Sequence, residues 1–112
     1  MAIPSGTGTE VLKNITVADN NDNEESHAVG AGNIWTILTI TACNVSGTDT
    51  AAAIRMYDGS YQISIWEGTV PANSTMVWND RFVLEHSDSL RFYNGAQNFD
   101  WMISYIVQDF GA

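Results

Sequence analysis

The most constraining feature of this sequence is a series of short runs in which apolar and polar residues alternate, separated by turn-forming residues. The clearest run is Asn33–Cys43, NIWTILTITAC, which is rich in Ile and Thr and places Leu38, Ile40 and Ala42 on one face. β-Branched residues and a period of two are typical of half-buried β-strands. No window keeps the 3.6-residue apolar period of an amphipathic helix, so the pattern predicts a chain with very little helix.

Turn signals divide the chain into about eight such runs at a spacing of ~8–12 residues, which is typical of a β-sandwich or barrel. The strongest signal is Asp58-Gly59, which predicts a hairpin between the two runs that flank it. We therefore predict an all-β fold, an antiparallel jelly-roll-like β-sandwich of about eight short strands. The predicted strands are Glu10–Ala18, Asn33–Cys43, Ala51–Tyr57, Ser60–Glu67, Ser74–Trp78, Arg81–Glu85, Ser89–Tyr93 and Phe99–Val107.

A chain of 112 residues fits one domain. Residues 10–112 are predicted to form a single β-sandwich domain. Residues 1–9 are mostly small or polar, and we expect them to form a flexible N-terminal arm. Aliphatic side chains at alternating sites of the strands form the predicted core. These core residues are Leu38, Ile40, Ile63, Ile65, Leu84, Leu90 and Ile103.

The charge balance limits the partners of the chain. Four Lys and Arg residues stand against thirteen Asp and Glu, giving a formal net charge of −9. Such a surface repels phosphate backbones and anionic lipid, so we expect neither nucleic-acid nor membrane binding. The charge serves solubility alone, or it attracts a cation or an electropositive partner. The first residues lack the basic start and apolar run of a signal peptide, which predicts synthesis in a cytoplasm.

No motif in the sequence carries catalytic chemistry. It lacks a glycine-rich phosphate loop, a Gly-Xaa-Ser-Xaa-Gly elbow and a His-Glu-Xaa-Xaa-His pair. Cys43 is the only cysteine, and neither His27 nor His86 lies near it in the sequence, so we expect a small buried hydrophobe rather than a nucleophile. Carboxylates that converge only in space, as in glycosidases, stay open. We expect no enzymatic activity.

The most polar stretch, DNNDNEE at residues 19–25, is expected to be an exposed loop. Oxygen-bearing side chains spaced two apart suit Ca²⁺, but the match to an EF-hand fails because Glu24 stands in the place of the turn glycine. A solvated acidic loop is the favoured interpretation, and a weak Ca²⁺ site is the alternative. No cofactor is otherwise expected. The candidate ligands are Asp19, Asn21, Asn23, Glu24 and Glu25.

The four tryptophans, Trp35, Trp66, Trp78 and Trp101, each lie inside a strand pattern. Large aromatic side chains on separate strands of a small sandwich favour the core or a subunit interface, although a carbohydrate-stacking platform is the alternative. Trp66 and Trp78 are the better surface candidates. We predict that they belong to a subunit interface.

The N-terminal arm is the second candidate interface. It contains Ile3 and Pro4, and we predict that these two residues contact a partner. An extended arm of this kind can pair with a sheet edge through main-chain hydrogen bonds, while a side chain such as Ile3 fills a pocket. The alternative is a frayed terminus without a role.

The stretch from Ile37 reads ILTITACNVSGTDTAAAIRMYDGSY, and the chain later continues VPANSTMVWNDRFVLEHSDSLRFYNGAQNFDWMISYIVQD. Over roughly the last two-thirds of the chain, these strand ends and turns resemble a family of small tailed-phage virion proteins. The family includes capsid decoration (cement) subunits and related head-fibre or tail modules. The matching positions are Thr41–Asn44, Ser46–Thr48, Pro71–Ser74, Val83–Leu84, Asp88–Arg91 and Ser104–Tyr105.

This resemblance implies a structural protein of the virion that binds and stabilises or decorates the outer surface of a viral capsid, without catalysis. The implied partner is the shell of major capsid protein, and the implied state is a homotrimer. Synthesis would then take place in the host cytoplasm. Two alternatives stay open: a tail-associated or fibre-base module of the same particle, and a carbohydrate-binding β-sandwich module.

Overall fold

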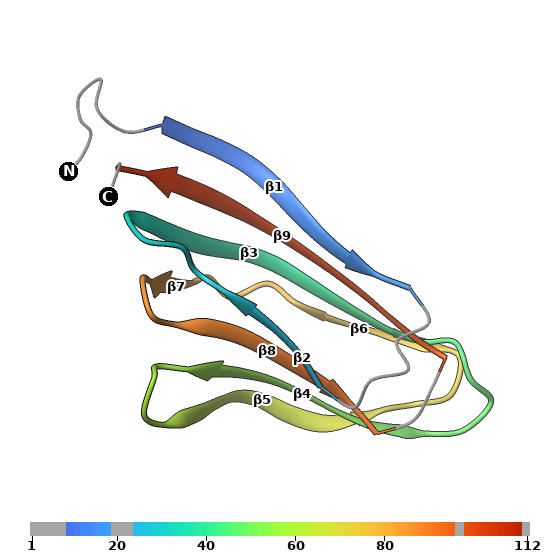
Figure 1. The fold of residues 1–112 in the computed structure, drawn as a ribbon. Helices are drawn as coiled ribbons and strands as arrows, with labels where there is room; N and C mark the ends of the chain where they lie inside the picture. Colours follow the sequence, from blue (N-terminus) through green and yellow to red (C-terminus); the bar gives the residue numbers. More distant parts are fainter. Residues whose placement is uncertain (1–8, 19–23, 96–97, 111–112) are drawn as a thin grey trace.

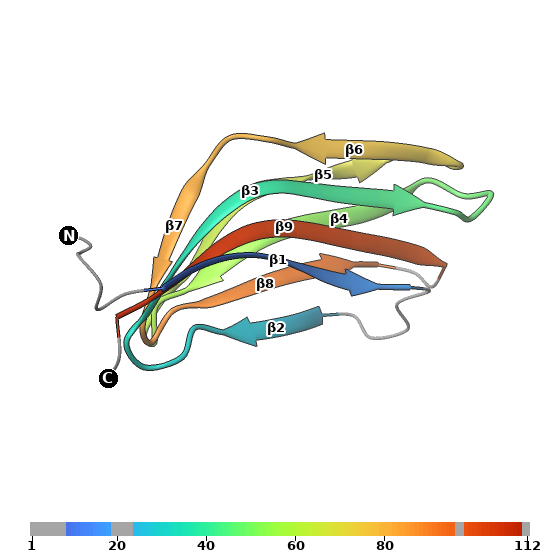
Figure 2. The same ribbon diagram turned by 90° about the horizontal axis from the view of Figure 1, so that it is seen from above.

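The computed structural model describes residues 9–18, 24–95 and 98–110. These residues contain no helix, and their strands form two antiparallel sheets that pack face to face (Figure 1, Figure 2). This arrangement confirms the predicted all-β fold class. The strands are β1 Thr9–Val17, β2 Glu24–Ala28, β3 Asn33–Asn44, β4 Thr50–Tyr57, β5 Gln62–Val70, β6 Ser74–Trp78, β7 Phe82–Glu85, β8 Ser89–Asn94 and β9 Phe99–Asp109.

The first sheet has the strand order β1-β9-β3-β6, with β7 also paired to β3, and the second sheet has the order β2-β8-β4-β5. β6 pairs with Ile40–Asn44 of β3 and β7 pairs with Ile34–Ile37, so β6 and β7 together act as one strand interrupted at residues 79–81. Counted in this way, each sheet has four strand positions. The chain visits the two sheets in the order of a jelly roll.

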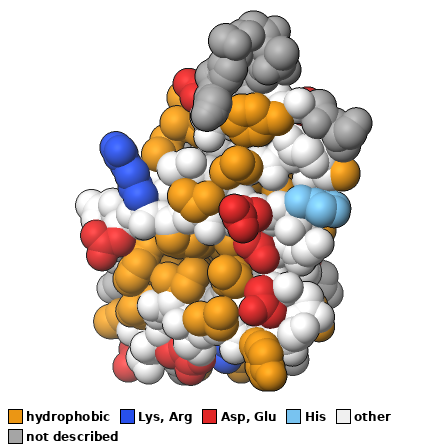
Figure 3. Space-filling model, turned by 90° about the vertical axis from the view of Figure 1, so that its left-hand side faces the viewer, with side chains coloured by type: hydrophobic (Ala, Val, Ile, Leu, Met, Phe, Trp, Pro, Cys, Tyr) orange, Lys and Arg blue, Asp and Glu red, His pale blue; other side chains and the backbone are white. Residues whose placement is uncertain are grey.

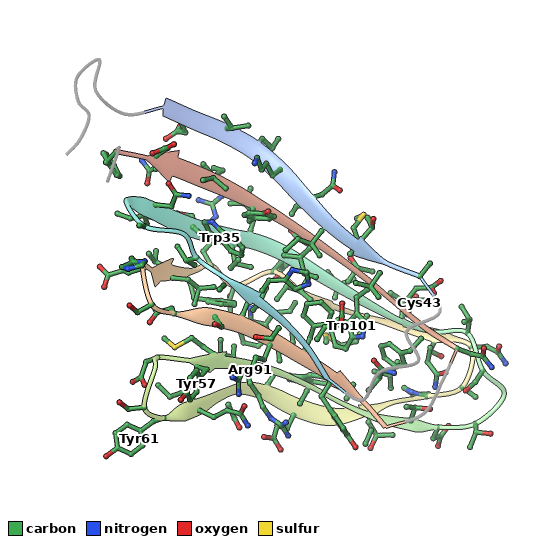
Figure 4. The ribbon with its side chains drawn as sticks, viewed as in Figure 1. Trp35, Cys43, Tyr57, Tyr61, Arg91 and Trp101 are labelled. Atoms are coloured by element: carbon green, nitrogen blue, oxygen red, sulfur yellow. The ribbon has the colours of Figure 1, made fainter. Side chains whose placement is uncertain are left out.

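Aromatic side chains on the inner faces fill the centre of the sandwich. The rings of Phe92 on β8 and Trp101 on β9 lie 4.9 Å apart, so the two sheets meet through them. The indole Nε1 of Trp101 donates a hydrogen bond of 3.0 Å to the buried Asn94 Oδ1, which satisfies both polar groups. Trp35 on β3 packs against Tyr105 on β9 with a centroid distance of 4.6 Å. Figure 4 shows Trp35 and Trp101 between the sheets.

Most of the predicted core is confirmed. Ile40, Leu84, Leu90 and Ile103 are fully buried, and Ile65 is half-buried and packs against the core. These residues come from both sheets. The alternation of apolar residues therefore identified the inner faces correctly over most of the chain.

Leu38 was predicted to be core and is only half-buried, so this prediction is wrong. The register between β3 and β9 shifts between Ile37 and Thr39, which marks a β-bulge at Leu38. A bulge adds one residue to one strand, so the inner face changes from odd to even residue numbers. The buried side chains of β3 accordingly include Ile37 before the bulge and Ile40 after it.

Ile63 and Cys43 are two further corrections. Ile63 is 45% exposed, because it lies near the start of β5, an edge strand with a neighbour on one side only. Cys43 was expected to be buried. It is half-buried instead, because it lies between the buried residues Ala42 and Asn44 and therefore points to the outer face of the first sheet.

The Asp58-Gly59 hairpin is confirmed, because β4 and β5 pair antiparallel with Tyr57 opposite Gln62. The carboxylate of Asp58 accepts backbone hydrogen bonds from Tyr61 and Ser60, which hold the pKa of Asp58 below its usual value. β2 is a correction. Residues 19–25 were expected to be loop throughout, but a strand begins at Glu24 and pairs with β8.

Asn44 closes the β3–β4 loop from inside the protein. Its side-chain nitrogen donates to the carbonyl oxygens of Thr48 (2.8 Å) and Val70 (3.0 Å), and its oxygen accepts from the backbone nitrogen of Ser46 at 3.0 Å. The side chain is fully buried and its hydrogen bonds reach both sheets. A buried amide with these partners fixes the loop, because any replacement leaves buried polar groups without partners.

The Pro71–Ser74 turn packs onto this loop. Its Asn73 has a positive φ of 55° and donates its backbone N–H to the carbonyl of Ser46 at 3.0 Å. The N–H of Ala72 donates to Asp49 Oδ1 at 3.0 Å. Two segments that carry the family resemblance therefore contact each other. Their residue types are explained by turn chemistry.

Candidate assembly surfaces

The outer face of the first sheet presents an exposed apolar row. The strand registers place Leu12, Ile106, Thr36 and Val83 side by side across β1, β9, β3 and β7. Leu12 is 70% exposed and Val83 is 53% exposed. All four residues belong to the face opposite the core, because their neighbours along each strand point inward.

A second row lies further along the same face. It consists of Thr16, Met102, Thr41 and Val77 on β1, β9, β3 and β6. Met102 is 45% exposed and Val77 is 56% exposed. Between the two rows lie Asn14, Ser104 and Thr39. We call these three rows together the uncharged face, because none of their side chains carries a charge.

Charged residues border the uncharged face at both ends and on the side of β6 and β7. Glu10 and Glu85 lie in the next row at one end, and Asp100 lies beyond the other end. Asp80 and Arg81 belong to the connection between β6 and β7. Exposed apolar area inside a polar rim is typical of protein–protein contact surfaces, whose centres are depleted of charged residues.

The end of the sandwich where β1 begins and β9 ends is also rich in hydrophobic surface (Figure 3). Asp and Glu side chains are set among the hydrophobic ones, and they are more prominent on this face than Lys and Arg. The acidic character of the chain is therefore visible beside its apolar areas. A partner that met this end through the acidic groups would need positive charge.

The sequence contained a signal for the uncharged face that the core prediction did not use. In β9, Met102 and Ile106 stand at positions that alternate with the core residues Trp101, Ile103 and Tyr105. A single exposed apolar residue is ordinary, but apolar residues that gather on the side of a sheet that should face water are typical of a contact surface. Leu12 and Val83 cannot be recognised as part of this face without the strand register, because the row that contains them crosses four strands.

Trp66 and Trp78 face inward. Trp66 pairs with the buried Ile54, and Trp78 pairs with the buried Ile40. Both indoles are half-buried and pack against the core. A Cβ at Gly68 would lie 2.8 Å from Cζ2 of Trp66, so glycine makes room for this ring. The interface role of these tryptophans stays a prediction.

A carbohydrate platform would need exposed aromatic faces. Trp35 and Trp101 are buried, and the other two tryptophans are half-buried. The described residues therefore present no fully exposed tryptophan on which a sugar could stack.

The remaining predicted contact and metal residues lie mostly outside the described part of the chain. Ile3 and Pro4 are outside it, and so are Asp19, Asn21 and Asn23. Thr9, the last residue of the predicted arm, is already the first residue of β1. The interface and cation predictions for these residues stay predictions.

Two of the candidate cation ligands fall in β2. The backbone of Glu24 begins this strand. Glu25 is opposite Phe92, and its carboxylate oxygen lies 3.8 Å from Nε2 of His27. Among residues 9–18, 24–95 and 98–110, no three His, Cys, Asp or Glu side chains gather closely enough to hold a metal ion. In the same ranges, no helix has the length and hydropathy to cross a bilayer.

Comparison with known proteins identifies the fold. No family model matches the chain, and no curated protein matches its sequence. Among solved structures, a subunit of Bacillus endospore appendages, described as disulfide-linked pili, has a TM-score of 0.54 at 13% identity, covering 97% of this chain and 95% of that chain. The capsid structure of Helicobacter pylori bacteriophage KHP30 has a TM-score of 0.51 at 8% identity, covering 93% and 94%.

A third solved structure is the NLP core of Drosophila, which is described in terms of pentamer formation and histone binding. It has a TM-score of 0.52 at 13% identity, covering 86% of this chain and 96% of that chain. At such identities the similarity concerns the fold alone. The chain therefore shares a jelly-roll-like sandwich with three proteins that are each described as part of an assembly: a pilus, a capsid and a pentamer.

Proposed function

We propose that this chain is a structural subunit of a virus particle that assembles with copies of itself and has no catalytic role. The observation that carries this proposal is the uncharged face on an otherwise acidic subunit. It is supported by the jelly-roll fold, by the fold similarity to a phage capsid structure and by the sequence resemblance to small phage virion proteins.

The physical argument starts from repulsion between copies. Two subunits with a formal net charge of −9 each repel one another over most of their surfaces. The repulsion is weakest where two surfaces without charge meet, and there exposed side chains such as Leu12 and Val83 lose contact with water. The charge thus favours association through this face over association through the acidic surfaces. A subunit built in this way is soluble alone and assembles in a defined geometry.

Within the particle, we propose attachment to the outer surface of the major capsid protein shell as a homotrimer. This finer statement rests on the sequence resemblance. A three-fold ring joins two different surface patches of each subunit at every contact, so the uncharged face would supply only one of the two patches. The proposed location is the virion, after synthesis in the host cytoplasm.

A second candidate is a tail-associated or fibre-base module of the same particle. The similarity to a pilus subunit favours it, because the same sandwich is described there in a fibrous assembly. A head-to-tail contact that does not close produces a fibre instead of a ring. The two candidates share the subunit and differ in copy number and symmetry.

Self-association tests the first part of the proposal. Sedimentation equilibrium of the purified chain should reveal an oligomer, and Met102→Glu should weaken it, because this change places a charge within the uncharged face. Thr48→Glu is the matched control, since it adds the same charge at an exposed site in the β3–β4 loop. A wild-type chain that stays monomeric at all concentrations would contradict self-assembly.

Imaging of intact particles tests the location. Electron cryomicroscopy of particles labelled with an antibody fragment against this chain should find many copies in symmetric positions on the shell. A few copies on a tail axis would support the fibre-base candidate instead. The absence of the chain from purified particles, checked by mass spectrometry, would overturn the virion proposal altogether.

A further inference from the structure

The second sheet places two cations side by side on an acidic protein. Lys13, Arg55, Arg81 and Arg91 are the Lys and Arg residues of the chain. β4 and β8 are the central strands of the second sheet, and their register puts Arg55 directly opposite Arg91. Like charges in this position destabilise a sheet. Half of the basic residues of a chain with a net charge of −9 are therefore concentrated at one unfavourable pair.

Each guanidinium lies over a tyrosine ring from the other strand. Cζ of Arg91 is 4.2 Å from the ring centre of Tyr57, and Cζ of Arg55 is 5.4 Å from that of Tyr93. The attraction between a guanidinium and an aromatic ring offsets part of the charge repulsion. We call these four residues the Arg–Tyr cluster.

Polar contacts fix the position of the cluster. Nη1 of Arg91 donates to Oε1 of Gln62 at 3.0 Å, while its Nε is buried and therefore out of reach of a partner. Arg55 interacts with Glu67, whose Oε2 lies 3.4 Å from its Nε. The hydroxyl of Tyr57 donates to the carbonyl of Gly59 at 3.1 Å, which holds the ring under Arg91.

An exposed aromatic residue stands beside the cluster. Tyr61 is 73% exposed and precedes Gln62, the residue that bonds Arg91. Figure 4 shows Tyr57, Arg91 and Tyr61 at the same corner of the sandwich, with Tyr61 pointing away from it. Arg and Tyr are the residue types enriched at energetic centres of protein–protein contacts. The corner therefore combines fixed cations with an exposed anchor.

We propose that the Arg–Tyr cluster and Tyr61 bind an acidic side chain of a second copy of this chain. A guanidinium fork recognises carboxylates and phosphates through paired hydrogen bonds. A nucleic acid would need a longer basic track, because its affinity comes from many phosphate contacts. Two arginines suffice for one carboxylate, and each copy carries thirteen Asp and Glu residues. The proposal rests on the self-assembly proposed above and names its second contact surface.

This contact joins two different surfaces and is therefore heterologous. The cluster lies on the outer face of the second sheet, whereas exposed carboxylates such as Glu85 and Asp80 border the uncharged face of the first sheet. A heterologous contact repeats from copy to copy and forms a ring if the rotation closes. Charge complementarity then orients subunits that the uncharged face alone would leave free to rotate.

The first experiment compares variants of equal charge. Arg91→Gln should raise the dissociation constant for self-association roughly tenfold or more, because it removes one partner of a desolvated charge pair. Lys13→Gln makes the same change in net charge at an exposed site of the edge strand β1 and should have a much smaller effect. Tyr61→Ser should weaken association without altering the charge. Sedimentation equilibrium measures all three, with far-ultraviolet circular dichroism as the check of folding.

Arg91→Lys keeps the experiment decisive if Arg91→Gln fails to fold. Equal amounts of ¹⁴N- and ¹⁵N-labelled Arg91→Lys protein are mixed and treated with a carbodiimide, which joins the lysine amine to a neighbouring carboxylate. Mixed-isotope crosslinks at residue 91 are expected, and mass spectrometry identifies the acidic residue. Crosslinks within one copy only would overturn the proposal.

The outcomes separate this inference from the function on which it rests. A monomeric wild-type chain would contradict both. An oligomer that Met102→Glu weakens and Arg91→Gln affects no more than Lys13→Gln would leave the assembly intact and overturn the role of the cluster. The proposal is also overturned if Arg91→Gln abolishes binding of a single-stranded oligonucleotide and leaves self-association unchanged.

Discussion

The two sheets of the sandwich have similar inner faces and different outer faces. Inward, both present aliphatic and aromatic side chains that are fully buried, such as Ile40 and Ile103 in the first sheet and Leu90 and Phe92 in the second. Outward, the first sheet presents the uncharged face, and the second presents the Arg–Tyr cluster. The same backbone geometry therefore supports two unlike surfaces.

This difference separates the requirements of folding from those of assembly. The fold needs apolar residues only at alternate positions of each strand, because only these face the core. The remaining positions are constrained weakly by the sheet itself. Exposed apolar rows on one outer face and stacked arginines on the other are therefore better explained by what each sheet contacts than by the stability of the subunit.

The largest expected effect compares inner and outer positions. Ile40→Ala in the first sheet and Leu90→Ala in the second should each lower the free energy of unfolding by about 2–5 kcal/mol, because each leaves a cavity in a shared core. Val77→Ala on the uncharged face is the matched control and should cost less than about 0.5 kcal/mol. Denaturant titration measures all three. A variant of Ile40 or Leu90 with the wild-type midpoint would show that its strand register is wrong.

The next effect concerns the loop that joins the sheets. Asn44→Ala should cost about 1–3 kcal/mol, because it leaves the buried carbonyl of Val70 without its hydrogen bond. Asn79→Ala, in the exposed connection between β6 and β7, is the control and should change little. Thermal unfolding of both variants provides the comparison. Equal melting temperatures would mean that the Asn44 hydrogen bonds contribute nothing net.

An alkaline transition should distinguish a tyrosine of the inner face from one outside it. Burial raises the pKa of Tyr105 above its usual value of 10.0. The unfolded chain then ionises first, so stability is fully present below pH 10 and is lost as the pH rises through the higher folded pKa. Tyr105→Phe should reduce this loss, whereas Tyr61→Phe in the exposed hairpin should not. The measurement is the urea midpoint of each protein between pH 8 and 11. If the midpoints of Tyr105→Phe and Tyr61→Phe fall equally steeply with pH, Tyr105 is not the source of the alkaline loss of stability.

The alternation of residues and the turn signals were sufficient to predict the fold class. Eight of the nine strands overlap a predicted run, and one of them, β6, coincides with the prediction at both ends, Ser74–Trp78. The two failures have different physical causes. β2 has the sequence EESHA, whose polarity conceals a strand that pairs only with β8. The bulge at Leu38 depends on how β3 fits β9, which no local pattern encodes.

The candidate surfaces were less accessible from the sequence. Arg55 and Arg91 are far apart along the chain, and only the register of β4 and β8 brings them together. The apolar row through Leu12 and Val83 likewise depends on three strand pairings. Trp66 was a natural interface candidate as a large aromatic residue, but its strand faces inward there. Surfaces of this kind depend on which strands pair and in which register, whereas the apolar face of one strand is visible in the sequence of that strand.

The smallest expected effect tests the charge network around Arg55 on the second sheet. A hydrogen bond from the Ser64 hydroxyl, and then the charge of Arg55, lower the pKa of Glu67 below its usual value of 4.5. A lowered pKa gives stability that is present above pH 4.5 and is lost as the pH falls through the folded pKa. Glu67 is exposed, so solvent screening keeps its effect at neutral pH small.

Glu67→Gln should therefore leave the urea midpoint at pH 7 almost unchanged and reduce its decline between pH 5 and pH 3. Glu85→Gln makes the same change on the rim of the uncharged face, where no arginine pair is present among the neighbouring strands, and serves as the control. If both variants alter the acid decline equally, the two outer faces do not differ in their electrostatics. If only Glu67→Gln alters the acid decline, the interactions around Arg55 contribute to the stability of the second sheet even in the isolated subunit.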